Sequence, residues 1–236
     1  MREGEIDKAR EVRDMFGSIA HRYDFLNHFL SLSIDRYWRR ACVVGTIRRM
    51  TRSQPTVLDI GCGTADLSLE FARSGPVVGC DFSHPMLRIG KDKIASADTS
   101  HPVALLEADA LNLPFRDGSF DAVASAFVLR NLASPQKGLE EMKRVLRPGG
   151  VVSILDFGLP KATLLRGPYL LYFNCVLPRL GKIFSGVDGP YKYLPDSVQL
   201  FPSPEELGAN LRQAGFGEID IRRLSGGIAI VIHARG

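Results

Sequence analysis

The sequence lacks several features that mark whole classes of protein. It has four cysteines among 236 residues and no Cys-x-x-Cys pair, which argues against a disulfide scaffold or a structural metal site and fits a reducing cytosol. Its longest apolar stretch, near residues 169–177, is far shorter than the roughly 20 residues that cross a bilayer. The charged first residues contain no apolar segment of the signal-peptide kind. We therefore expect a cytoplasmic protein that neither spans a membrane nor holds a metal.

An excess of charge of one sign is also missing. The chain carries 30 basic and 26 acidic residues, a formal net charge of +4. Its densest basic groups, at residues 36–40 and 48–49, are interpreted as solvated helix faces or, alternatively, as a patch for an anionic lipid or ligand. Nucleic-acid-binding proteins concentrate Lys and Arg more strongly, so no nucleic-acid partner is expected. The hydrophobic share of 45% is ordinary for a globular protein.

Short apolar runs alternate with amphipathic segments between residues 56 and 157. The predicted strands are residues 56–60, 77–80, 103–107, 120–126 and 151–157. The predicted helices are residues 66–73, 85–97 and 135–146, and Arg-Pro-Gly-Gly at 147–150 is a predicted turn. Such alternation indicates parallel strands joined by right-handed crossovers. Runs that are apolar throughout suit strands buried on both faces.

Three flanking segments complete a predicted single domain of residues 1–236. Residues 1–50 have apolar side chains at helical intervals and form a helical extension to the 56–157 core. Residues 158–202 break the alternation and are predicted to be an insertion over the carboxyl edge of the sheet. Residues 203–236 combine a helix at 204–214 with two apolar runs around a Gly-rich turn. That pattern predicts a β-hairpin, and hence a reversed last strand.

The strongest chemical signal is Asp-Ile-Gly-Cys-Gly-Thr at residues 59–64, directly after the first predicted strand. Glycines let a ligand approach the backbone, and open α/β sheets bind ligands at the carboxyl ends of their strands. A dinucleotide fingerprint would need a third glycine where Asp66 stands, and that carboxylate would repel a pyrophosphate. S-adenosylmethionine has no phosphate and carries a positive sulfonium, so the motif favours this cofactor. A tight turn without a ligand is the alternative.

Acidic residues also follow the next two predicted strands. Asp81 can accept hydrogen bonds from both hydroxyls of a ribose, although a solvated loop residue is the plain alternative. Asp109 can accept from the exocyclic amine of an adenine, and the Ala110 backbone N–H can donate to its ring. A helix cap is the other interpretation of Asp109. Together with residues 59–64, these positions predict an adenosyl site.

These motifs as a set resemble class I methyltransferases over residues 56–157. A narrower resemblance, to the ubiquinone/menaquinone biosynthesis C-methyltransferases, covers nearly the whole chain and rests chiefly on residues 23–27, 129–131, 144–150 and 191–194. It implies a Rossmann-like α/β fold, with a seven-stranded mostly parallel sheet, helices on both faces and an antiparallel last strand. The predicted cofactor-binding residues are then Asp59, Gly61, Gly63, Thr64, Asp81, Asp109 and Ala110.

The same resemblance implies an acceptor and the residues around it. Tyr23, Arg130 and Asn131 are the expected catalytic residues, with Arg130 stabilising a phenolate or, alternatively, forming an ion pair below the pocket. The acceptor is expected to be a prenylated quinol, demethylmenaquinol in the first place. Two departures from the family pattern favour this menaquinone branch. Asp35 stands where many members have His, and Ala126 stands where some ubiquinone-side members have Ser.

Other functions stay open at this point. They are a methyltransferase for a ubiquinone precursor, a sterol or a phenol, and a non-catalytic adenosyl-binding module. A nicotinamide dehydrogenase is disfavoured because no Ser/Tyr/Lys proton-transfer set is evident. The aromatics of the insertion could shelter a prenyl tail, or the segment could be an ordinary lid. Its basic residues could meet anionic lipid in a peripheral membrane contact, and the sequence also leaves a homodimer open. The basic residues of the insertion are Lys161, Arg166, Arg179 and Lys182.

Overall fold

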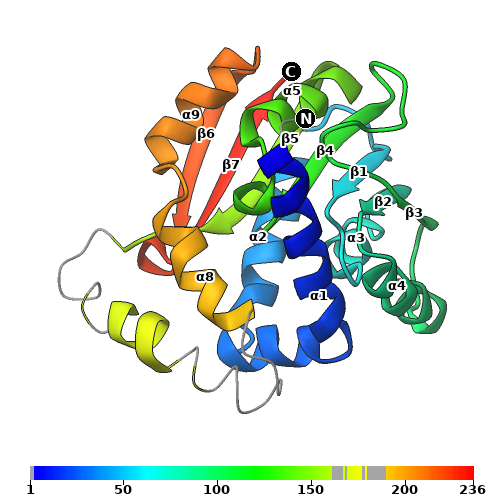
Figure 1. The fold of residues 1–236 in the computed structure, drawn as a ribbon. Helices are drawn as coiled ribbons and strands as arrows, with labels where there is room; N and C mark the ends of the chain where they lie inside the picture. The colour runs from blue at the N-terminus through cyan, green and yellow to red at the C-terminus, as the bar shows by residue number, and fades with distance from the viewer. Residues whose placement is uncertain (1–2, 161–166, 168, 177–178, 180–189) are drawn as a thin grey trace.

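The computed structural model describes residues 3–160, 167, 169–176, 179 and 190–236 (Figure 1). Seven strands form one sheet in the order β3-β2-β1-β4-β5-β7-β6, and β7 runs antiparallel to both of its neighbours. The strands are β1 Val57–Ile60, β2 Val77–Asp81, β3 Val103–Glu107, β4 Phe120–Ala126, β5 Leu146–Phe157, β6 Gly217–Leu224 and β7 Ala229–Arg235. The predicted Rossmann-like fold with its reversed last strand is confirmed.

Helices cover both faces of the sheet and its carboxyl edge. They are α1 Glu3–Leu30, α2 Ile34–Ile47, α3 Asp66–Phe71, α4 His84–Ser96, α5 Pro135–Val145, α8 Pro190–Gln199 and α9 Pro204–Gln213, with short helices η1 Leu129–Asn131, η2 Tyr172–Val176 and η3 Ser225–Gly227. Among the described residues, no helix has the length and apolar character needed to cross a bilayer. Lys161, Arg166 and Lys182 of the predicted insertion lie outside the described residues.

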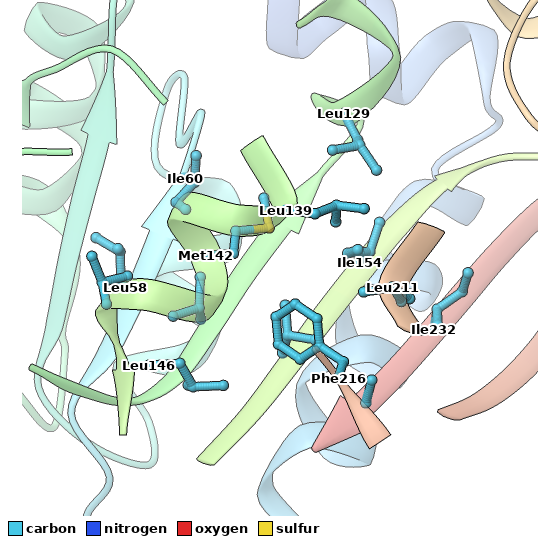
Figure 2. Packing of buried hydrophobic residues seen from close by; sticks show 14 of the residues in the cluster. Leu58, Ile60, Leu129, Leu139, Met142, Leu146, Ile154, Leu211, Phe216 and Ile232 are labelled. Atoms are coloured by element: carbon cyan, nitrogen blue, oxygen red, sulfur yellow. The ribbon is translucent and has the colours of Figure 1, made fainter. Parts of the chain in front are cut away.

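The core has two layers because side chains alternate across each strand. Leu58 and Ile60 of β1 point to the face where α5 and α9 pack, together with Met142 and Leu211 (Figure 2). Val57 belongs to the opposite layer, where α2 and α3 cover the sheet. This two-sided burial explains why the central strands are apolar throughout and why β1 could be predicted without an alternating pattern.

The predicted turn at residues 147–150 was wrong. These residues belong to β5, where Phe120 pairs with Leu146 but Ala122 pairs with Val151, so the intervening residues bulge out of register. Gly149, at φ +73°, adopts the left-handed conformation that this bulge requires. Its backbone N–H donates to the carbonyl of Gly236 at 2.8 Å, so pairing with the end of the chain extends the strand.

Candidate functional site

Two neighbouring cavities lie at the carboxyl edge of the sheet. The first cavity measures about 360 Å³ and is bordered by the ends of β1, β2 and β4 and by α1. The second cavity measures about 190 Å³ and is enclosed mainly by α1, α2 and residues 169–173. Phe16, Tyr23 and Phe127 line both. The first cavity is within the size range of small-molecule sites, and the shared walls place any ligand of one beside a ligand of the other.

The loop after β1 brings backbone close to the first cavity. Gly61 and Gly63 line it at φ +65° and +54°. A Cβ on Gly61 would lie 2.4 Å from the side chain of Val128, so only glycine fits there. Asp81, at the end of β2, accepts hydrogen bonds from the backbone N–H groups of Gly63, at 2.9 Å, and Ser83, at 2.8 Å. These bonds orient the carboxylate at the cavity wall.

Asp81 can still take further donors. Its carboxylate is almost fully buried, and burial raises its pKa, although the two backbone N–H groups offset part of this. A carboxylate has about four lone-pair positions, and the two backbone bonds use only two of them. The cis-diol of a ribose supplies the two O–H donors that would complete this set.

The loop after β3 forms the far wall of the first cavity. Asp109, Ala110 and Leu111 line it. Asp109 accepts a hydrogen bond from the Leu111 backbone N–H at 2.8 Å, so one oxygen caps the local turn and the other remains for a ligand. Asn131 lines the same cavity, and its buried Oδ1 has no partner among the described residues. The acceptors and the apolar walls fit an adenosyl group.

Two predicted cofactor residues lie behind this cavity and do not border it. Asp59 is buried under the loop, where it accepts a hydrogen bond from Ser68 at 2.6 Å, and burial raises its pKa to about 7. Thr64 donates to Asp24 of α1 at 2.5 Å and lies 3.3 Å from the ammonium of Lys93. A direct cofactor contact by either residue stays a prediction. In this geometry both of them hold the loop and α1 in place.

The walls of the second cavity are aromatic. Phe127 and Phe157 pack with ring centroids 4.7 Å apart, and Trp38 lies 6.0 Å from Phe157. Phe127 has φ +63°, which is rare for a bulky residue and marks stored backbone strain at the wall between the two cavities. The other aromatic side chains that line the second cavity are Phe16, Tyr23, Tyr169, Tyr172, Phe173 and Tyr193.

Arg130 brings a buried positive charge to this aromatic cavity. Its guanidinium donates to the fully buried Asp156 at 2.6 Å and lies 5.2 Å from the ring centroid of Phe157. The ion pair anticipated for Arg130 therefore exists. The Arg130 Nε–H, however, is buried and has no partner among the described residues. One donor of the guanidinium is thus left for a ligand in the second cavity.

The structure separates the three predicted catalytic residues. Arg130 lines the second cavity, Asn131 lines the first, and Tyr23 borders both. Burial raises the pKa of the Tyr23 hydroxyl, while Arg39 and a hydrogen bond to Asn27 oppose this shift. Tyr23 is therefore a neutral hydrogen-bonding group near pH 7.

Sequence reasoning did not place the polar side chains of Tyr169 and Asp35 in an acceptor cavity. The Tyr169 hydroxyl is buried without a partner among the described residues. Asp35 accepts hydrogen bonds from Ser31, at 2.8 Å, and Arg39. Nδ1 of His28, a residue that does not line the cavity, lies 2.8 Å from the same carboxylate. No local motif marks these residues, because helix packing alone brings them together.

Comparison with known proteins identifies the family. The model of the ubiE/COQ5 methyltransferase family matches residues 4–235. The chain belongs to this family. It is similar to the ubiquinone/menaquinone biosynthesis C-methyltransferase UbiE of Geobacter sulfurreducens, with 44% identity over 95% of this chain and 88% of that one. It is also similar to the demethylmenaquinone methyltransferases of Deinococcus radiodurans (44% identity; 94% and 91% covered) and Thermus thermophilus (44%; 92% and 97%).

A solved structure supports the fold of this methyltransferase. A SAM-dependent methyltransferase of Thermotoga maritima, described as a possible histamine N-methyltransferase, has a TM-score of 0.65 and 20% identity, covering 94% of this chain and 98% of that one. The predictions of a methyltransferase and of S-adenosylmethionine as its cofactor are confirmed by the family and the fold.

Proposed function

We propose that this methyltransferase methylates a ring carbon of a prenylated naphthoquinol, converting demethylmenaquinol to menaquinol, and that the ring binds in the second cavity. Similar proteins named demethylmenaquinone methyltransferase support this acceptor class. The observation that carries the proposal is a pair of buried polar atoms, Arg130 Nε and Tyr169 Oη, that have no partner among the described residues and line a largely aromatic cavity. A quinol has a flat apolar body and two ring oxygens, and it matches both features.

The first cavity would hold the methyl donor. S-adenosylmethionine, when bound, supplies an electrophilic methyl group. Asp81 would accept from its ribose hydroxyls, and residues 109–110 would meet its adenine. Tyr23 and Phe127 border both cavities and would keep the two ligands next to each other. Holding two reactants in place can by itself remove a large part of a reaction barrier.

Arg130 would favour the reactive form of the acceptor. A ring carbon becomes nucleophilic when the neighbouring hydroxyl loses its proton, and a free phenol has a pKa of about 10. In this cavity the Arg130 charge lowers the pKa of the Tyr169 and Tyr193 phenols, although burial raises both by more. A quinol oxygen that accepts from Arg130 Nε would be in direct contact with that charge. The Arg130 charge would therefore stabilise the phenolate form of the quinol more than it stabilises the phenolate forms of Tyr169 and Tyr193.

Asp35 is the one carboxylate among the described residues that line the second cavity. Burial alone would raise its pKa, but Arg39 and the hydrogen bond from Ser31 hold the pKa of this carboxyl below its ordinary value. Asp35 is accordingly a weak base. We propose that it relays a proton only after Arg130 has lowered the pKa of the acceptor hydroxyl.

A methyl-transfer assay tests the proposed function. The protein is incubated with trideuteromethyl S-adenosylmethionine and either a reduced short-tail demethylnaphthoquinol or the corresponding ubiquinone-type benzoquinol. We expect mass spectrometry to locate the label on a ring carbon of the naphthoquinol. Transfer to an oxygen would contradict C-methylation, and transfer to the benzoquinol alone would assign the enzyme to the ubiquinone branch. Such acceptors reside in a bilayer because of their prenyl tails, so a cytoplasmic enzyme would collect them at a membrane surface.

A further inference from the structure

Exposed large hydrophobic side chains gather at one end of the molecule. Five of the nine among the described residues lie within residues 25–37, where α1 turns into α2. Leu32 is 81% exposed and Phe25 is 59% exposed, and Phe25 stacks on Phe29 with ring centroids 5.8 Å apart. We call this surface the apolar tip, which consists of Phe25, Phe29, Leu32, Ile34 and Tyr37.

A second apolar segment extends the tip. Leu171 and Val176 are also exposed and lie at η2. The Tyr172 hydroxyl donates to the carbonyl of Leu30 at 2.8 Å, which holds this segment against the end of α1. Figure 1 shows the α1–α2 turn and residues 169–176 at the same end of the molecule, away from both termini. The two exposed apolar segments therefore lie next to each other.

The apolar tip reaches the second cavity through one of its residues. Ile34 both lines this cavity and is 41% exposed, so the cavity reaches the surface at the tip. Leu30 and Tyr172, which join the two exposed segments, also line this cavity. A ring bound inside would thus extend any apolar tail outward across this surface.

Among the residues that the structure describes near the tip, exposed basic side chains outnumber exposed acidic ones. Arg36 and Arg40 on α2, and Arg179 beyond η2, are exposed. Asp35 is turned inward and paired with Arg39, so it does not neutralise them. Asp196 of α8 is the exposed acid of the neighbouring helix. An apolar surface with exposed guanidinium groups beside it matches the interface of a bilayer that contains anionic phospholipids.

We infer that the apolar tip docks on an anionic bilayer and presents the mouth of the second cavity to the membrane. This inference rests on the proposed function, because an acceptor with a prenyl tail is what the bilayer would deliver. Patches of this kind on otherwise polar proteins mark interaction surfaces. Aromatic side chains such as Tyr37 suit the boundary between lipid and water.

Vesicle sedimentation tests the surface directly. The unmodified protein is mixed with phosphatidylcholine vesicles, with or without phosphatidylglycerol, and the bound fraction is measured. The double variant Phe25→Ser/Leu32→Ser should lose at least about tenfold in affinity for both vesicles, because it removes inserted apolar area. Arg36→Gln/Arg40→Gln should abolish only the gain from phosphatidylglycerol. Val44→Ser on α2 changes an exposed apolar residue outside the tip and should have no effect.

Several results would overturn this inference. One is failure of the unmodified protein to bind either vesicle, and another is a loss of vesicle affinity in Val44→Ser as large as that in the double variant. Unchanged vesicle binding in Phe25→Ser/Leu32→Ser would also contradict it. A change from dimer to monomer in that double variant, measured by sedimentation velocity, with vesicle binding intact, would assign the tip to self-association instead. Turnover of the water-soluble short-tail acceptor tests the proposed function independently of membrane binding. The double variant should retain that turnover, so failure of the surface and failure of the function are distinguishable.

Discussion

The first and second cavities share three wall residues but surround a ligand differently. The first presents backbone groups and carboxylates at the ends of β1, β2 and β3. The second presents aromatic rings, and the guanidinium groups of Arg39 and Arg130 lie 5.7 and 5.2 Å from the ring centroids of Phe127 and Phe157. Polar groups fixed by the backbone suit a cofactor with many hydrogen-bonding atoms. A cationic aromatic box suits a flat ring that develops negative charge.

This contrast predicts that acceptor chemistry and cofactor binding can be damaged separately. The largest expected effect is that of Arg130→Gln, which should lower kcat about 10²- to 10³-fold by removing the buried donor and its charge. Calorimetry should show nearly unchanged affinity for S-adenosylhomocysteine, because Arg130 does not line the first cavity.

Arg130→Gln leaves Asp156 as a buried carboxylate without its ion-pair partner, which can destabilise the variant. A control must therefore separate loss of stability from loss of turnover. The double variant Arg130→Gln/Asp156→Asn removes both charges and should recover stability without recovering turnover. Arg212→Gln, at an exposed position on α9, should leave both properties unchanged. Turnover near the unmodified rate in the double variant would show that the Arg130 charge is only structural.

A complementary substitution alters the first cavity and should affect cofactor binding. Asp81→Asn should weaken binding of S-adenosylhomocysteine about 10- to 100-fold, because charged hydrogen bonds to the ribose are lost. At saturating S-adenosylmethionine, kcat should stay within a few-fold of the unmodified value. An unchanged dissociation constant, measured by calorimetry, would remove Asp81 from the cofactor site.

Tyr169→Phe should produce a smaller effect on the acceptor side. Loss of one neutral hydrogen bond predicts a drop of about five- to tenfold in kcat/KM for the quinol, with cofactor affinity unchanged. Tyr172→Phe is the matched control, since its hydroxyl is used by the Leu30 carbonyl. That variant should lower stability more than turnover. Equal kinetic effects of the two changes would deny Tyr169 a ligand contact.

The smallest expected effect concerns stability. Burial raises the pKa of Asp59 to about 7, above its unfolded value, so folding favours the protonated carboxyl. The stabilisation is complete below the unfolded pKa of about 3.9 and is lost progressively as the pH rises to about 7, so the free energy of unfolding should still fall by about 1–2 kcal/mol between pH 6 and 8. Asp59→Asn should remove this part of the pH dependence in denaturant titrations. Identical pH profiles would mean that Asp59 is charged in the folded protein.

The two cavities also differ in how far the sequence predicts them. Gly61, Asp81 and Asp109 each follow a strand within a short motif, and parallel strands bring their carboxyl ends together, so the first cavity was predictable. Tyr169 and Asp35 reach the second cavity only because residues 169–173 and α2 pack against α1, and no local sequence spacing predicts that packing. Asp59 faces α3 because side chains alternate along β1, a detail that the motif alone does not reveal.

A crystal structure with S-adenosylhomocysteine and a demethylnaphthoquinone tests the central claim most directly. We expect the nucleoside in the first cavity with its ribose on Asp81. We expect the quinone in the second cavity, with its oxygens on Arg130 Nε and Tyr169 Oη. A quinone bound outside the second cavity, or one whose oxygens turn away from both atoms, would contradict this division of the site.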